Sequence, residues 1–259
     1  MNFSFVALLT VLGMIGGTLV MLEIGRRLGV LQMARDPEVA KANTGAIEGA
    51  VFGLMGLLIA FTFSGAGSRF DTRRAMIVEE ANSIGTAWLR LDLLPAAAQP
   101  PLRGLFRQYF DARLAAFRKV PNITAMREEL ARAAVLQNHI WAQAVAACRD
   151  DGSQPTTMLL LPALNQMFDV ATSRTIGVQM HPPMIIYAML GMLLLAGSLL
   201  AGYGLGVGRL HNWFHGSAFV LVMTLTVYVI LDFEFPRVGI IRIHPFEQVL
   251  VDLRQSMNP

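Results

Sequence analysis

Hydrophobic residues gather in four long stretches that carry almost no charge, at residues 3–22, 44–67, 183–207 and 216–231. A helix of about 20 apolar residues is about 30 Å long, which matches the hydrocarbon core of a bilayer. Only Glu48 interrupts the second stretch. The first stretch has no basic segment before it and is long for a signal peptide, so we expect it to be retained. The pattern predicts four transmembrane helices.

Residues 68–182 have a different pattern, typical of helices with one apolar face. At the start of this region hydrophobic residues recur at three- and four-residue steps: Phe70, Ile77, Ala81, Ile84, Trp88 and Leu91. Glu79, Glu80 and Arg90 fall on other faces of the same helix. No proline separates this stripe from the second span. We therefore expect the second span to continue as one long helix that leaves the membrane.

Three further helices are expected in the same region. Pro95 ends the first pattern, and the Pro-Pro pair at residues 100–101 opens the next helix. Asn122 or Thr124 is positioned to cap a third helix, because short polar side chains accept hydrogen bonds from free N–H groups at a helix start. A fourth apolar segment follows at residues 155–178. No segment has a convincing strand pattern.

The fold class predicted from these patterns is an all-α integral membrane protein. Its expected organisation is transmembrane helices 1 and 2 at residues 1–67, a soluble helical region at 68–182, transmembrane helices 3 and 4 at 183–232, and a C-terminal tail at 233–259. With four spans, both termini and the soluble region lie on one side of the membrane. Basic residues flank the spans on both sides in similar numbers, so they do not decide which side this is.

Composition agrees with a membrane protein. Hydrophobic residues make up 54% of the chain and charged residues only 15%, whereas soluble domains contain about 25% charged residues. The net charge of +3 is small and the basic residues are mixed with acidic ones, so we expect no nucleic-acid partner. The single cysteine, Cys148, excludes a disulfide within the chain.

The sequence contains no constellation that predicts an enzyme, a metal site or a cofactor. His211 and His215 are four residues apart and would share a helix face, a spacing found in zinc sites. No Cys, Asp or Glu nearby completes a coordination set, so we expect an interfacial segment between two spans instead. The Glu79–Glu80 pair is expected to be a solvated or ion-paired face rather than an acid/base pair.

The second span carries a row of glycines. Gly45, Gly49 and Gly53 recur at every fourth residue, and Leu57 and Phe61 continue the same face. One interpretation is a helix-packing face within a subunit, because small residues let helices approach closely in lipid. The other is a pore lining with Leu57 and Phe61 as a hydrophobic constriction, as in channels that gate by dewetting. A pore of this kind requires several copies of the helix, and hence a homo-oligomer.

Charged residues near the membrane are costly and often functional. Three acidic residues close a span and are expected to pair at the membrane interface: Glu23, Asp232 and Glu234. Arg237 and Arg242 are the expected partners of the last two. Glu48 lies one turn inside the second span, beside the glycine row. We expect Glu48 to line the entrance of the pore.

Two segments carry a resemblance to known proteins. The second span and the helix after it resemble bestrophins at Leu58-Ile59-Ala60-Phe61, Ser64, Arg69-Phe70, Arg74, Glu79 and Asn82. The whole chain is more similar to a family of bacterial membrane proteins described as bestrophin-like. That resemblance is carried by residues 80–90 (EANSIGTAWLR) and 231–242 (LDFEFPRVGIIR).

Bestrophins are pentameric ion channels with four spans per subunit and a cytosolic helical region. The resemblance therefore implies a homo-oligomeric channel, with a pentamer as the expected form, and with the bilayer, permeant ions and further copies of the chain as its partners. It also implies the bacterial inner membrane, with the soluble region and both termini in the cytoplasm. The bestrophin neck falls on Gly53, Leu57 and Phe61, the face already selected by spacing.

The chain also departs from bestrophins. Gly67 and Asp71 stand where bestrophins tend to have aromatic residues, and the sequence lacks an acidic cluster like the calcium clasp of the animal channels. Calcium gating is therefore not implied, and Glu48 near the pore entrance disfavours anions. The alternative function is a non-conducting membrane scaffold whose soluble helical region binds a partner.

Overall fold

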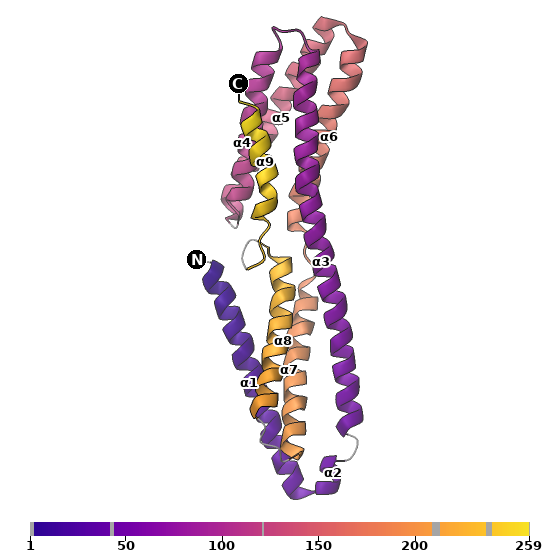
Figure 1. Ribbon diagram of the computed structural model, residues 1–259, viewed down its shortest axis with the longest axis vertical. Coiled ribbons are helices and arrows are strands. Elements are labelled where there is room, and N and C mark those ends of the chain that lie inside the picture. The colour runs from indigo at the N-terminus through magenta and orange to yellow at the C-terminus, as the bar shows by residue number, and fades with distance from the viewer. Residues whose placement is uncertain (1–2, 42–43, 121, 209–212, 237–239, 259) are drawn as a thin grey trace. The chain divides into compact units, whose positions relative to one another are not determined.

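The computed structural model describes residues 3–41, 44–120, 122–208, 213–236 and 240–258, and no strand occurs among them. The elements in chain order are α1 (Phe3–Arg35), α2 (Pro37–Lys41), α3 (Thr44–Arg90), η1 (Leu91–Leu93), α4 (Gln99–Arg118), α5 (Ile123–Asp151), α6 (Gln154–Gln179), α7 (Met184–Val207), α8 (Trp213–Glu234) and α9 (His244–Ser256) (Figure 1). The all-α prediction is confirmed.

The predicted spans fall in α1, α3, α7 and α8. Four helical stretches in the described part of the chain are long and apolar enough to cross a membrane, judged by length and composition. The second of them continues without a break to Arg90, so the expected long helix is present as the 47 residues of α3. The predicted four-span fold is therefore confirmed.

The helices group into two compact units. We call residues 1–70 and 181–241 the membrane unit, and residues 71–180 and 242–259 the bundle unit. The helix α3 contributes its first part to the membrane unit and its last part to the bundle unit. The segment after the fourth span includes α9, which belongs to the bundle unit because Leu250 of α9 and Met257, just after its end, are buried in that unit's core.

Glycines bring two helices of the membrane unit into backbone contact. A Cβ at Gly25 of α1 would overlap the carbonyl oxygen of Leu199 on α7, and a Cβ at Gly202 would overlap a carbonyl oxygen of α1. Gly29 and Gly206 repeat this arrangement one turn further along. Each helix thus presents two glycines four residues apart, the small-residue pattern of close helix pairs in membranes. The sequence pattern alone does not distinguish Gly25 and Gly29 from the other glycines of the spans.

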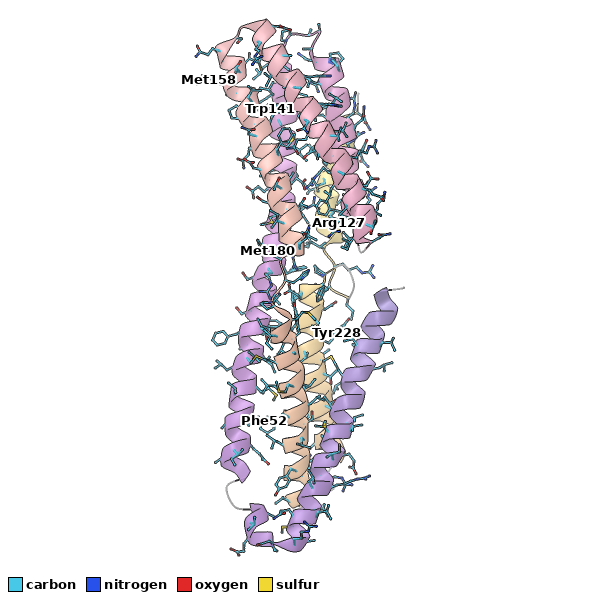
Figure 2. The ribbon with its side chains drawn as sticks, turned by 180° about the vertical axis from the view of Figure 1, so that it is seen from behind. Phe52, Arg127, Trp141, Met158, Met180 and Tyr228 are labelled. Carbon is cyan, nitrogen blue, oxygen red and sulfur yellow. The ribbon has the colours of Figure 1, made fainter. Side chains whose placement is uncertain are left out.

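The core of the bundle unit follows the predicted apolar stripe. Ile77, Ile84 and Leu91 are at most 1% exposed, and they pack with large aromatic side chains of α4. The Asn122 side chain accepts a hydrogen bond from the N–H of Ala125, so it caps α5 as expected. Gly152 ends α5 in the left-handed conformation at φ 64°. Trp141 of α5, labelled in Figure 2, packs against this core and is partly buried.

Candidate functional site

The glycine row of α3 is open within a single chain. No described atom of another element lies within 4 Å of the position that a Cβ would take at Gly45, Gly49 or Gly53. Leu57 and Phe61, which continue the row, are 54% and 69% exposed. In the structure of one chain, this face therefore packs against no other helix that is described.

The opposite face of α3 packs against the other spans. The ring of Phe52 (Figure 2) meets Phe219 of α8 edge-on, with centroids 6.0 Å apart. Met55 is 6% exposed, and its sulfur lies 3.0 Å from the Cβ position of Gly197 on α7. Thus α3 is attached to α7 and α8 by one face while the row from Gly45 to Phe61 stays free.

Glu48 lies on the α7 side of α3. Its carboxylate oxygen is 3.5 Å from the position of a Cβ at Gly204. This oxygen is buried and has no hydrogen-bond partner among the described residues. A carboxylate at this depth is costly when it is unpaired. Its role at a pore entrance stays a prediction.

The two acidic residues at the end of α8 have polar partners in the structure. Glu234 is 1% exposed; it accepts a hydrogen bond of 2.8 Å from Nε of Arg69 and lies 3.0 Å from Nδ1 of His181. The Asp232 carboxylate accepts hydrogen bonds from the backbone N–H groups of Ile240 and Ile241 at 2.8–3.1 Å. The sequence did not suggest Arg69, which is 165 residues from Glu234.

The structure describes only some of the other charged residues and histidines that the sequence singled out. Glu23 pairs with Arg26 and Arg27 at 2.7 Å on its own helix. Arg237 and His211 lie outside the described residues. His215 is described, and its ring meets that of Phe214 edge-on at 6.0 Å. Across the described residues, no group of three or more metal-ligating side chains is found.

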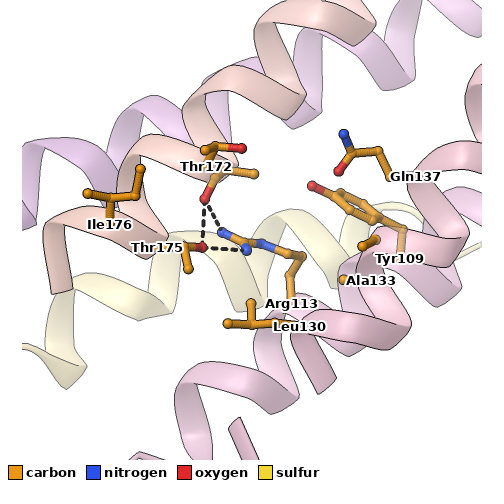
Figure 3. A pocket seen from close by; sticks show the side chains of 10 residues that line it. Tyr109, Arg113, Leu130, Ala133, Gln137, Thr172, Thr175 and Ile176 are labelled. Atoms are coloured by element: carbon orange, nitrogen blue, oxygen red, sulfur yellow. Dashed lines mark hydrogen bonds between the residues drawn. The ribbon is translucent and has the colours of Figure 1, made fainter. Parts of the chain in front are cut away.

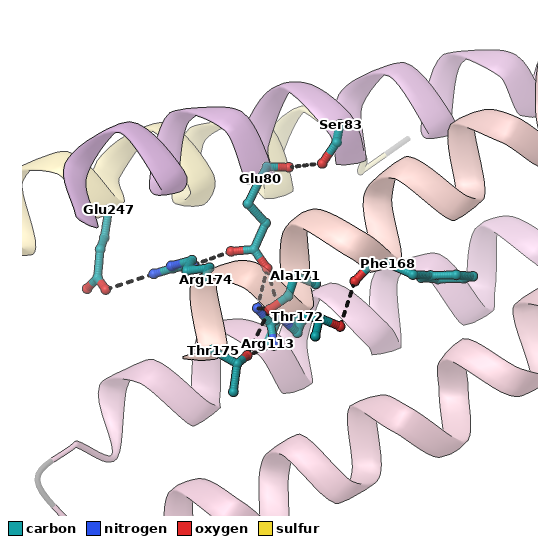
Figure 4. A network of polar contacts seen from close by, with 9 residues as sticks. All are labelled: Glu80, Ser83, Arg113, Phe168, Ala171, Thr172, Arg174, Thr175 and Glu247. Atoms are coloured by element: carbon teal, nitrogen blue, oxygen red, sulfur yellow. Dashed lines mark hydrogen bonds and ion pairs between the residues drawn. The ribbon is translucent and has the colours of Figure 1, made fainter. Parts of the chain in front are cut away.

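A buried ion-pair network joins helices of the bundle unit (Figure 4). Glu80 on α3 is 0% exposed and accepts a hydrogen bond of 2.8 Å from Nε of Arg113 on α4. Its other oxygen binds Arg174 on α6. Arg174 in turn lies 3.1 Å from Glu247 on α9. The network therefore connects four helices through two acids and two arginines.

Of the two alternatives for Glu80, a solvated or an ion-paired face, the structure shows an ion-paired side chain, and this side chain is buried. The side chain is inside the core because Arg113 and Arg174 neutralise it there. Both arginines also lie over the ring of Phe117, at 5.0 Å and 3.7 Å from its centroid. The sequence signal was weak, because the two arginines are 33 and 94 residues away.

The fold is that of an all-α protein with several membrane-spanning helices and a helical bundle attached to them. Residues 13–247 match the model of the Bestrophin-like domain. Because this match covers most of the chain, the protein belongs to the Bestrophin-like family. The resemblance inferred from the sequence is confirmed.

Solved structures show the same fold at low sequence identity. A bacterial bestrophin homologue from Klebsiella pneumoniae with a single substitution is 16% identical, with TM-score 0.70, and the match covers 95% of this chain and 98% of that chain. Another structure of a bestrophin homologue from this organism gives 16% identity, TM-score 0.62, and 95% and 99% coverage. A structure described as a membrane protein is 16% identical with TM-score 0.63, and the match covers 93% of this chain and 98% of that chain. No curated protein matches the sequence.

Proposed function

We propose that the protein is a homo-oligomeric ion channel whose pore is lined by α3, with Gly53, Leu57 and Phe61 at a hydrophobic neck. The observation that carries this proposal is the free face of α3. The helix packs against α7 and α8 by its opposite face, whereas Leu57 and Phe61 are more than half exposed. Membership of the Bestrophin-like family supports a channel-type role.

The glycines argue against simple exposure to lipid. Leu57 and Phe61 alone would suit a lipid-facing surface. Contact with lipid, however, does not require glycine, so it does not explain the row of Gly45, Gly49 and Gly53. Small residues in membrane helices occur where another backbone approaches closely. A ring of α3 helices from several copies supplies such neighbours. The glycines then allow the helices to approach one another closely, and the bulky residues narrow the pore around the axis.

The number of copies and the ion are part of the same proposal. We infer a ring of about five copies, in line with the pentamers to which the sequence is similar, in the bacterial inner membrane with the bundle unit and both termini in the cytoplasm. Glu48 lies near the start of α3 on its α7 side, so in a ring of several copies these carboxylates would surround the pore entrance from behind the glycine row. Their negative charge would favour cations over anions, because rings of acidic side chains select cations.

The neck is tested by ion flux from vesicles that contain the purified protein. We expect Phe61→Ala to raise the flux severalfold, since a hydrophobic constriction conducts poorly when it is narrow enough to lose its water. Phe214→Ala is the matched control, because Phe214 is also exposed at 77% but lies on α8. The control should conduct like the wild type.

Two results would contradict the proposal. A flux that is the same for wild type, Phe61→Ala and empty vesicles would favour the non-conducting scaffold, in which the bundle unit binds a partner. A flux that rises equally in Phe61→Ala and Phe214→Ala would indicate a general loss of membrane integrity. In that case Phe61 would not be the constriction.

A further inference from the structure

The bundle unit contains a cavity of about 200 Å³ between α4, α5 and α6 that is open to solvent (Figure 3). Half of its lining is apolar and consists of alanine, leucine and isoleucine side chains. The polar half comprises Tyr109, Arg113, Gln137, Thr172 and Thr175. None of these residues belongs to the proposed pore. The cavity is therefore a separate feature that the channel proposal does not use.

The hydroxyl of Tyr109 is the unusual group in this cavity. Tyr109 is 1% exposed, and its ring packs edge-on to Phe168 with centroids 6.2 Å apart. Its hydroxyl has no hydrogen-bond partner among the described residues. Burial raises the pKa of Tyr109, so the hydroxyl keeps its proton and can donate it. A buried donor without an acceptor is costly, which indicates that an acceptor is supplied from the cavity.

The charge around the cavity is already balanced. Arg113 directs its N–H groups to Glu80, to the Thr175 hydroxyl at 3.0 Å and to the Ala171 carbonyl at 2.9 Å. Behind it, Arg174 binds Glu80 and Glu247. Two arginines thus face two carboxylates. An ionised ligand would gain no net attraction here and would lose its hydration.

The cavity also contains hydrogen-bond acceptors. The Thr172 hydroxyl donates to the Phe168 carbonyl at 3.0 Å, so its oxygen lone pairs remain available to accept. The amide of Gln137 lies near the Tyr109 hydroxyl in Figure 3 and offers both a donor and an acceptor. A molecule that both accepts and donates hydrogen bonds would therefore be complementary to the polar half of the lining.

We propose that this cavity is a binding site for a small uncharged amide, whose carbonyl oxygen accepts a hydrogen bond from Tyr109. Its N–H group would donate to Gln137 or Thr172, and its apolar part would contact the alanine side of the cavity. The size follows from the volume, since a cavity of about 150 Å³ holds one benzene molecule. The ligand then has about six to eight non-hydrogen atoms.

The test uses two probes of equal shape, isobutyramide and isobutyrate, with the full-length protein in detergent. Binding is titrated by ligand-observed NMR. A molecule of this size binds with millimolar affinity in ordinary cases. We expect saturable binding of isobutyramide and at least tenfold weaker binding of isobutyrate. Tyr109→Phe removes a single oxygen and should weaken the binding of isobutyramide roughly three- to tenfold, the range expected for the loss of one hydrogen bond.

Two alanine variants locate the binding. Ala134 lines the cavity, so Ala134→Leu should fill it and abolish binding. Ala131 lies on the same helix but is not part of the lining, and Ala131→Leu should bind like the wild type. Thermal unfolding of each variant shows that it is folded; if Tyr109→Phe fails to fold, the alanine pair alone decides the location.

Three outcomes would overturn the proposal. If isobutyrate binds as well as isobutyramide, the site does not select uncharged ligands. Isobutyramide binding that persists in Ala134→Leu would place it elsewhere on the protein. No saturable binding of either probe would mean that water alone satisfies Tyr109. Because no readout involves ion flux, the result is independent of the channel proposal.

Discussion

The carboxylate of Glu80 contacts two arginines from different helices, Arg113 on α4 and Arg174 on α6. All three side chains are at most 6% exposed. Taking such charges out of water is expensive, and their mutual attraction offsets this cost only while every partner is present. At the scale of single residues, the fold of the bundle unit therefore depends on the completeness of this network.

Removal of Glu80 should strongly destabilise the protein. We expect Glu80→Ala to lower the free energy of unfolding by about 3–5 kcal/mol, because it leaves two buried arginines without their shared carboxylate. Its neighbour Glu79 is exposed, and Glu79→Ala should change stability by less than about 0.5 kcal/mol. Chemical denaturation of the detergent-solubilised protein measures both. Equal effects of the two variants would mean that the network is not a structural element.

Glycine rows of the same spacing have different environments on different helices of the membrane unit. Gly25 and Gly202 sit at a contact where α1 and α7 touch through their backbones. Gly45, Gly49 and Gly53 of α3 have no described neighbour within reach of a Cβ. At the scale of elements, the first set holds one chain together, whereas the second is available to another copy.

A single methyl group should distinguish these two environments. In Gly202→Ala the added Cβ would overlap the backbone of α1, and rigid backbone cannot move aside as a flexible side chain does. We expect a loss of at least about 1–3 kcal/mol, the usual cost of overpacking, seen as a lower thermal unfolding midpoint. Gly191→Ala on the same helix is the control, since no described atom lies within 4 Å of its Cβ position. A midpoint that is unchanged in Gly202→Ala would contradict the close α1–α7 contact.

The free face of α3 makes assembly the central question for the whole molecule. One copy of α3 cannot enclose a path for ions, so the proposed function requires several chains. The face that would line the pore includes Phe61, which is 69% exposed. A channel therefore predicts a closed ring in which this face is covered.

The mass of the purified protein tests this directly. We expect native mass spectrometry in mild detergents to give one discrete assembly of about five chains of 28.3 kDa each. A closed ring has a defined copy number because its rotation must close. A monomer or dimer in several detergents would leave no axis for a pore, and would shift the interpretation to the scaffold.

Sequence patterns determined those properties that depend on neighbouring residues. The charge-free stretches located the spans, and the absence of proline predicted that α3 runs without a break to Arg90. Of the two candidate caps, Asn122 and Thr124, Asn122 caps the helix. Residues 80–90 and 231–242 carried the family resemblance, which the match over residues 13–247 confirms. All of these rely on periodicity or on motifs that are continuous in the chain.

Only the tertiary structure decided which faces and charges meet. The same four-residue glycine spacing gives a backbone contact at Gly202 and an open face at Gly49, because packing depends on what another helix places opposite. Likewise, the burial of Glu80 and the pairing of Glu234 with Arg69 depend on residues far away in the chain. Local patterns encode which residues form a helix; the partners of each side chain follow from contacts between helices that are distant in sequence.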